Sequence, residues 1–228
     1  MNDNSDNKNV HTSIFVVLGM IFVTCLLVSN LIAGKIWLVW DGVEVPASVI
    51  LFPITYILAD VFTEVYGFGK ARLIIWTGFG CNFLAVFCYV VTIILPSPNH
   101  WLGQDAFAVV LGMTPRFLLA SFIAYLVGEF SNSMILSMLK VRTKGKRLWE
   151  RTIGSTIVGE AFDSFIFITI AFAGTMPTKQ LFSMILFQYL FKLSFEVVFT
   201  PVTYLVIGFL KKKEGIDTFD YEQRYDII

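Results

Sequence analysis

Two six-residue motifs place acidic and amide side chains inside segments that are otherwise apolar. GEFSNS covers residues 128–133 and GEAFDS covers residues 159–164, so both read G-E-x-x-[N/D]-S. An unpaired charge at the centre of a bilayer costs about 2.5–3.5 kcal/mol on insertion scales. A membrane segment keeps such groups only where they face each other, water or a ligand, and the sequence therefore predicts a polar site within a membrane.

Helical spacing sorts the polar residues of these segments onto one face of each helix. Glu129 and Asn132 share such a face, as do Glu160 and Asp163, and no basic residue stands three or four positions from any of them. We expect these four side chains to form the centre of a binding site. Further candidates for substrate binding follow similar spacing or stand at the end of a span: Phe52, Tyr56, Asp60, Glu64, Asn82, Gln188 and Arg116.

Several of these polar residues also have a structural interpretation. Lys192 and Glu196 stand one helical turn apart and are expected to form an ion pair with a structural or coupling role. Arg116 pairs with a carboxylate only if a neighbouring helix brings one close, and otherwise extends towards the membrane surface. The small residues around Gly154 and Gly159 also suit close packing between helices.

Asp60 and Glu64 are open to a similar alternative. Both stand near the end of their apolar segment, where the following Lys70 and Arg72 could neutralise them. A structural role and a role in ligand binding are equally compatible with this position.

The chemistry of the acidic and amide groups narrows the ligand. A carboxylate beside an amide accepts paired N–H donors, such as those on the Watson–Crick edge of a guanine-like base. The same acidic groups would also suit an amine or a transported proton. Aromatic side chains that could stack on a flat ring are Phe52, Tyr56, Tyr125, Phe162 and Phe165. The residues alone indicate a flat or cationic ligand.

The composition is that of an integral membrane protein. The 228 residues are 56% hydrophobic and 15% charged, whereas soluble domains carry about a quarter charged residues. No basic patch alternates with aromatic residues, so nucleic-acid binding is not expected. The apolar segments contain no histidine and no G-x-S-x-G or H-E-x-x-H motif. We therefore expect neither an enzyme nor a metal site or cofactor.

The apolar segments predict an all-α fold with six transmembrane helices, since about 20 residues cross the hydrocarbon layer. A turn-like stretch at 41–46 precedes the second span, which carries Pro53 in its middle. A short apolar piece at 106–111 is expected to be interfacial or re-entrant. The six spans cover residues 14–33, 47–66, 71–95, 116–139, 152–173 and 181–210.

Positive charge predicts the orientation, because cytoplasmic loops carry an excess of Lys and Arg. Thirteen of the 17 basic residues fall on one side of the predicted spans, which places both termini in the cytoplasm. The chain then divides into a polar cytoplasmic N-terminus (1–13), a transport domain (14–210) and a cytoplasmic tail (211–228). The tail is expected to be solvated and partly disordered, with its Lys211–Lys213 run near lipid headgroups.

Three segments resemble the queuosine precursor transporter family, also called the vitamin uptake transporter family. They are FPITYILADVFTEVYGFGKAR (52–72), GEFSNS (128–133) and RTIGSTIVGEAFDSFIF (151–167). The resemblance covers most of the six spans, with the motifs in the family's order. The matching residues are Phe52, Pro53, Thr55, Tyr56, Asp60, Glu64, Tyr66, Gly67, Gly128, Glu129, Asn132, Ser133, Arg151, Ser155, Thr156, Gly159, Asp163 and Ser164.

The resemblance implies a multi-pass permease of the bacterial inner membrane that imports 7-deazaguanine precursors of the tRNA base queuosine. These are queuine, 7-cyano-7-deazaguanine and 7-aminomethyl-7-deazaguanine. The expected mechanism is alternating access, in which Glu160 or Asp163 binds the guanine-like edge and Glu129 and Asn132 complete the polar contacts. The expected partners are this small molecule and membrane lipid.

Two other interpretations remain open at this point. The chain could be the substrate-binding subunit of an energy-coupling factor vitamin transporter, because those subunits are also small and six-spanning. An intramembrane protease that uses a carboxylate pair is the rival from a different class. A homodimer is compatible with so small a permease, although no segment argues for one.

Overall fold

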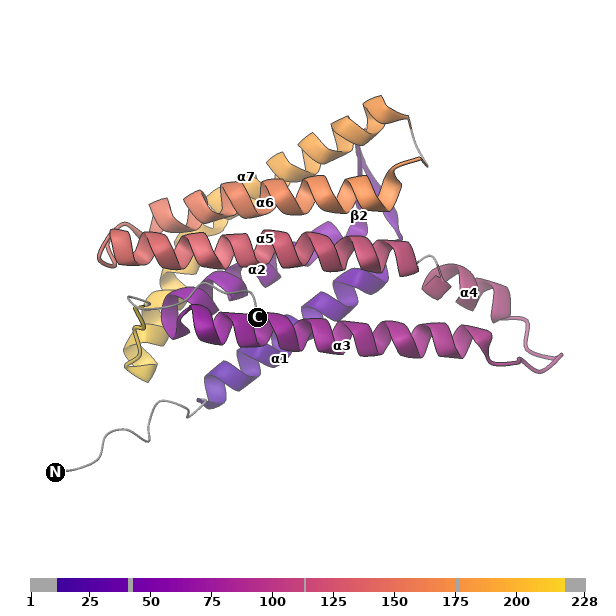
Figure 1. The fold of residues 1–228 in the computed structure, drawn as a ribbon, viewed down its shortest axis with the longest axis horizontal. Helices are drawn as coiled ribbons and strands as arrows, with labels where there is room; N and C mark the ends of the chain where they lie inside the picture. The colour runs from indigo at the N-terminus through magenta and orange to yellow at the C-terminus, as the bar shows by residue number, and fades with distance from the viewer. Residues whose placement is uncertain (1–11, 41–42, 113, 175–176, 220–228) are drawn as a thin grey trace.

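The computed structural model describes residues 12–40, 43–112, 114–174 and 177–219. Five helices are long and apolar enough to cross a membrane, and three of them, α3, α5 and α6, lie side by side while α1 and α7 cross them obliquely (Figure 1). Their ends fall close to the expected span ends. These helices are α1 (Ser13–Ile32), α3 (Phe68–Ile94), α5 (Thr114–Arg142), α6 (Leu148–Phe172) and α7 (Thr178–Glu214).

The residues expected to form the second span do not form one continuous helix. They form a 3-10 turn (η2, Ala47–Ile50), the ten-residue helix α2 (Phe52–Val61) and a π-helical turn (η3, Phe62–Tyr66). Pro53 lies in the first turn of α2, where its missing N–H breaks no helical bond. The structure therefore supports five continuous spanning helices rather than six. π-helical turns are frequent at functional sites.

Two short elements lie outside the helical bundle. Strands β1 (Ile36–Trp40) and β2 (Val43–Pro46) pair antiparallel, so the stretch expected to be turn-like is partly a strand and the fold is not purely helical. Helix α4 (Gln104–Gly112) has no buried residue and lies at one end of the molecule (Figure 1). That position agrees with the interfacial placement expected for residues 106–111.

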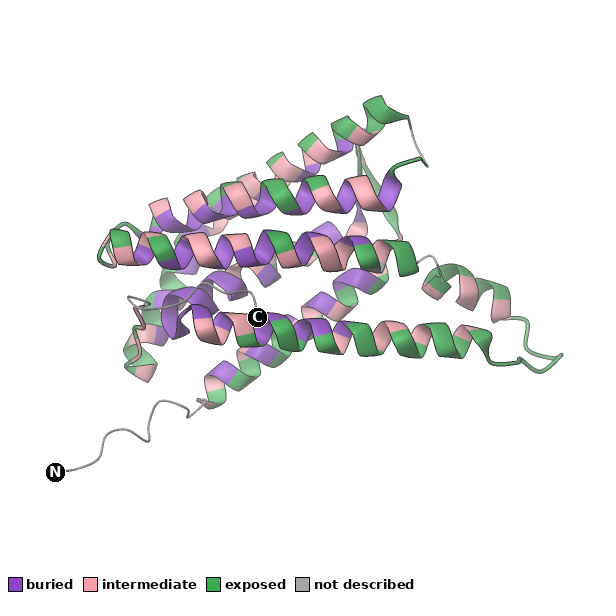
Figure 2. Cartoon of the chain, viewed as in Figure 1, coloured by how far each residue is buried: buried purple, intermediate pink, exposed green. Residues whose placement is uncertain are grey.

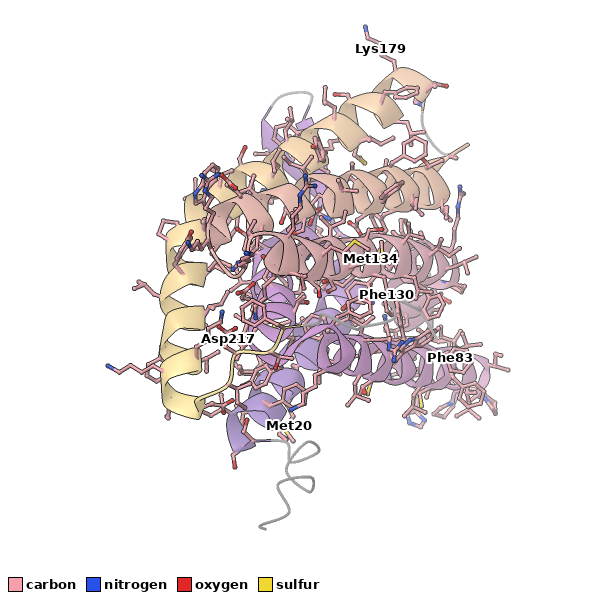
Figure 3. All side chains as sticks on the ribbon, turned by 60° about the vertical axis from the view of Figure 1, so that its left-hand side comes forward. Met20, Phe83, Phe130, Met134, Lys179 and Asp217 are labelled. Atoms are coloured by element: carbon pink, nitrogen blue, oxygen red, sulfur yellow. The ribbon has the colours of Figure 1, made fainter. Side chains whose placement is uncertain are left out.

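Burial is concentrated on the inner faces of the helices (Figure 2). An aromatic cluster joins α1 to the chain around η3, where the ring of Phe15 packs edge-on against Phe62 and Tyr66. The outer half of α3 is exposed, and Phe83, labelled in Figure 3, is 72% accessible there. In a membrane protein such apolar surface faces lipid.

The chain after α7 folds back onto the bundle. Lys140 donates a hydrogen bond to Asp217 at 2.6 Å and lies 4.5 Å from the ring centre of Phe219. The backbone N–H of Thr218 bonds to the carbonyl of Val65. Figure 3 shows Asp217 between the end of α7 and the other helices. Of the expected tail, residues 211–214 therefore belong to α7 and residues 217–219 contact the bundle, while 220–228 lie outside the described residues.

Candidate functional site

The two G-E-x-x-[N/D]-S motifs meet where α5 and α6 run antiparallel. A Cβ atom on Gly128 would lie 2.9 Å from the Cβ of Asp163, and one on Gly159 would lie 2.8 Å from the Cβ of Asn132. The first residue of each motif therefore faces the fifth residue of the other, in a local two-fold arrangement. Because neither glycine has a side chain, the helices approach closely enough to bring the polar groups of both motifs together.

Lys192 on α7 bridges to the carboxylates of α6. Its Nζ lies 3.0 Å from Oε2 of Glu160, forms a second, short ion pair with Asp163, and donates to the Tyr56 hydroxyl at 3.2 Å. The salt bridges described for Lys192 go to α6, and the expected ion pair with Glu196 stays a prediction.

Asp60 connects α2 to the first motif. Its Oδ1 accepts a hydrogen bond from Nδ2 of Asn132 at 3.0 Å, and Thr63 donates to Ser133 one turn further along. The expectation that Lys70 neutralises Asp60 is not met, because the Lys70 amine lies over aromatic rings at 5.6 and 5.7 Å. A neutral amide is therefore the hydrogen-bond partner that the structure shows for Asp60.

Glu64 lies in a different environment, at the centre of a cation cluster. Its Oε1 is 2.7 Å from Nη2 of Arg151, 2.8 Å from Nζ of Lys211 and 3.7 Å from Nζ of Lys140. Arg151, Lys211 and Lys140 are thus the cations that the structure describes beside Glu64.

The cluster of Glu64, Arg151, Lys140, Lys211 and Asp217 joins five segments of the chain at one end of the bundle. Partial burial alone would raise the pKa of Asp217, but hydrogen bonds from Lys140 and Lys211 hold it below its ordinary value. We call this group the end cluster.

Two small cavities flank the Lys192–Asp163 ion pair. The first has a cavity volume of about 20 Å³ and lies between α1, α3, α5 and α6, and Asp163 is part of its wall. The second, of about 10 Å³, lies between α2, α6 and α7, and Glu160 and Lys192 are part of its wall. The rest of the first wall is Leu26, Asn30, Phe79, Asn82, Ser121, Tyr125 and Phe167.

The first cavity combines polar and aromatic groups. The rings of Phe79 and Tyr125 pack edge to face with centres 5.1 Å apart. Asn30 and Asn82 are both buried, and Nδ2 of Asn30 has no hydrogen-bond partner among the described residues. A carboxylate, two amides and three rings are groups suited to a flat, polar heterocycle, which the cavity would admit only after the surrounding helices move apart.

Other predicted residues lie inside the bundle without a described partner. Both carboxylate oxygens of Glu129 and both amide atoms of Gln188 are buried and have no hydrogen-bond partner within the described part of the chain. Glu196 lines the second cavity. These buried polar groups are placed to bind a polar molecule or a proton that enters the bundle.

Three residues that were expected to contact the ligand or a buried carboxylate lie away from the cavities. Arg116 is exposed, and its guanidinium donates to the carbonyls of Ile170 and Ala173 at the end of α6. Phe162 and Phe165 are 45% and 54% exposed and line an outer apolar groove against α7, so stacking on a buried ligand is excluded for them. The side chain of Phe52 lies outside the described residues.

Asn30, Phe79 and Phe167 were not among the predicted site residues. Asn30 could have been found by the criterion that selected Asn82, since it is an amide inside an apolar segment. Nothing in the local sequence distinguishes Phe79 or Phe167 from the other 21 phenylalanines of the chain. Their role depends on which helices become neighbours.

The comparisons of this chain with known proteins agree on one family. A sequence model described as "Putative vitamin uptake transporter" matches residues 46–206. A "Probable queuosine precursor transporter" of Bacillus subtilis is 26% identical over 164 residues, covering 72% of each chain.

Two further relatives agree. The "Queuosine precursor transporter" of Escherichia coli is 26% identical over 166 residues, covering 71% of this chain and 72% of its own. A "Probable queuosine precursor transporter" of Haemophilus influenzae has the same identity, covering 71% of this chain and 68% of its own. No solved structure matches the chain. The family match covers well over half of the sequence, and the chain belongs to the vitamin uptake transporter family.

Proposed function

We propose that this protein imports a queuosine precursor, a 7-deazaguanine base, across a bacterial inner membrane, and that the first cavity binds it. The observation that carries the proposal is the composition of this cavity. Asp163 provides a carboxylate, Asn30 and Asn82 provide amides, and Phe79, Tyr125 and Phe167 provide aromatic rings. The names of three relatives support the substrate class.

Asp163 is the group that accepts the paired N–H donors of the guanine-like edge. In the structure it is paired with Lys192, which also contacts Glu160. When the base engages Asp163, Glu160 keeps the lysine charge compensated, so that no unpaired ammonium remains in the low-dielectric interior. Glu129 and Asn132 lie behind this contact and complete the polar surroundings.

Asn30 and Asn82 bind the remaining polar edge of the base, and the rings hold its faces. An amide offers both a donor and an acceptor, so it can pair with a lactam carbonyl or with a ring nitrogen. Aromatic rings prefer offset or edge-to-face contact with a second ring. The 7-substituent, which differs between the precursors, then points out of this pocket.

Alternating access requires that one end of the bundle is closed while the other admits substrate. The end cluster closes the end that carries most basic residues, which we assign to the cytoplasmic side. Transport then proceeds by opening of this cluster after the base has bound. The broken segment of η2, α2 and η3 is the element that this opening displaces.

Binding to the detergent-purified protein tests the proposal. Queuine, 7-cyano-7-deazaguanine and 7-aminomethyl-7-deazaguanine are titrated into the wild type, with guanine and biotin as comparison ligands. Asp163→Asn should weaken the binding of a deazaguanine by roughly 10- to 150-fold, since hydrogen bonds to a charged group contribute about 1.5–3 kcal/mol. Asp105→Asn, an exposed carboxylate on α4, is the matched control.

Two results would contradict the proposal in different ways. Unchanged affinity in Asp163→Asn would move the site out of the first cavity. Absence of binding of every deazaguanine by folded wild-type protein would overturn the substrate class. Uptake into liposomes that contain this chain alone would separate a self-sufficient permease from a subunit of an energy-coupling factor transporter.

A further inference from the structure

The interior of the bundle holds more buried carboxylates than buried cations. Asp60, Glu129, Glu160, Asp163 and Glu196 are each at most 6% exposed. In the part of the chain that the structure describes, their salt bridges involve a single amine, that of Lys192, which contacts Glu160 and Asp163.

The remaining buried cations are committed elsewhere. Arg151 and Lys140, together with the partly exposed Lys211, form salt bridges with Glu64 and Asp217 in the end cluster. Carboxylates that are buried without a compensating cation take up protons rather than remain charged. The closed bundle therefore carries protons among Asp60, Glu129 and Glu196.

Asp60 and Glu196 form the best-defined pair among these three. They lie on α2 and α7, which pack against each other inside the bundle. Oδ2 of Asp60 and Oε1 of Glu196 are buried and have no hydrogen-bond partner among the described residues. Two carboxylates buried on packed helices do not both stay ionised when no cation is paired with them, so at least one of them binds a proton.

We propose that Asp60 and Glu196 form a proton-binding site that couples the entry of one proton to the import of one substrate molecule. The identity of the imported substrate rests on the proposed function, whereas the existence of the proton-binding site does not. Five titratable groups surround the pair. Tyr56 lies on α2 with Asp60, and Glu64 lies on the following turn, η3. The other three are Glu129 on α5, Glu160 on α6 and Lys192 on α7. Helix α1, which packs against α2, contributes only Cys25 among its described residues.

The coupling follows from the packing of α2 against α7. With a proton on the pair the two helices can close, whereas two ionised carboxylates would repel each other and draw in water. Opening towards the cytoplasm hydrates the pair and releases the proton there.

Asn132 links the proton site to the substrate cavity. It donates to Asp60, and its Cβ faces Gly159 in the motif that carries Asp163. The state of the pair is thereby transmitted to the helix that holds the substrate-binding carboxylate.

Transport in liposomes gives the first test. The purified protein exchanges radiolabelled 7-cyano-7-deazaguanine across the membrane, with the membrane potential held at zero. A gradient of one pH unit, acid outside, should drive accumulation towards about tenfold in the wild type, because one pH unit corresponds to about 1.4 kcal/mol per proton. Glu196→Gln should retain exchange and lose this accumulation, while the exposed Glu44→Gln should behave as the wild type.

An infrared measurement tests the proton site without any substrate. The C=O stretching band of protonated carboxyl groups should be present in the wild type at neutral pH and shift in D₂O. The double variant Asp60→Asn with Glu196→Gln should reduce this band, and Glu44→Gln should leave it unchanged.

The outcomes separate the two proposals. Exchange in the wild type without accumulation in the pH gradient would overturn proton coupling and leave the substrate assignment intact. An unreduced carboxyl band in the double variant would overturn the proton site. Absence of exchange for every deazaguanine would instead overturn the proposed function, while the infrared result would still decide the proton site.

Discussion

Asp163 lies between two polar environments, with the Lys192 amine on one side and the first cavity on the other. A carboxylate in this position can exchange an ion pair for hydrogen bonds to a ligand without becoming exposed. Glu160 differs, because it lines the second cavity and stays beside Lys192 and away from the amides. At the level of single residues, the two acidic positions of one motif thus share the Lys192 amine but line different cavities.

The amides of the first cavity allow a test of how the base is oriented. Asn30→Ala and Asn82→Ala each remove one hydrogen-bonding group, which should weaken the binding of 7-cyano-7-deazaguanine roughly two- to twelvefold, given about 0.5–1.5 kcal/mol per neutral hydrogen bond. Asn99→Ala, in the exposed loop before α4, is the matched control. Titration calorimetry would show the difference, and equal affinities for all three variants would exclude the amides from the site.

The sequence predicted the burial of the polar residues better than their pairing. Glu129, Asn132, Glu160 and Asp163 were expected inside the bundle because their types are costly in contact with lipid, and the structure buries all four. The partner of Lys192 was not found, because a spacing of four positions describes one helix and says nothing of the carboxylates that a second helix presents.

At the scale of elements, the contact between α5 and α6 depends on two glycines. A Cβ on either Gly128 or Gly159 would meet the other helix at under 3.0 Å, close to backbone atoms that cannot move aside. The repeat of the motif in consecutive antiparallel segments predicted a shared site. It could not predict that the glycines themselves form the crossing point.

Alanine at these glycines should separate the two helices. Gly128→Ala and Gly159→Ala are each expected to lower the free energy of unfolding by about 1–3 kcal/mol, the usual cost of overpacking. Gly80→Ala is the matched control, since no atom lies within 4 Å of its added Cβ. Thermal unfolding in detergent measures the effect, and variants as stable as Gly80→Ala would show that the contact tolerates a methyl group.

The elements that the sequence predicted least well are those whose geometry is irregular. The second span was expected to be continuous with Pro53 in its middle, but the π-helical turn at 62–66 depends on tertiary contacts, such as that of Thr63 with Ser133. The docking of residues 215–219 was missed for a related reason. A short polar tail has no periodic pattern, and its order comes from Lys140 and Val65 on distant elements.

For the whole molecule, the arrangement of charge gives the two ends different properties. The end cluster gathers three cations, of which Lys140 and Arg151 are buried, around Glu64 and Asp217. The loop between α5 and α6 at the same end is rich in basic residues. The opposite end carries the β1–β2 hairpin and α4 (Figure 1). Because cytoplasmic loops carry an excess of Lys and Arg, we propose that the end cluster faces the cytoplasm.

Cysteine labelling tests this orientation. In a background with Cys25, Cys81 and Cys88 replaced by alanine, a single cysteine is placed outside the helices at either end. Asn99→Cys precedes α4, and Lys144→Cys lies in the loop between α5 and α6; both positions are exposed. A membrane-impermeant maleimide should label Asn99→Cys in intact spheroplasts, whereas Lys144→Cys should react only after the membrane is permeabilised. The reverse pattern would place the end cluster on the outer face of the membrane. The end of the bundle that the cluster closes in this structure would then be the outer end.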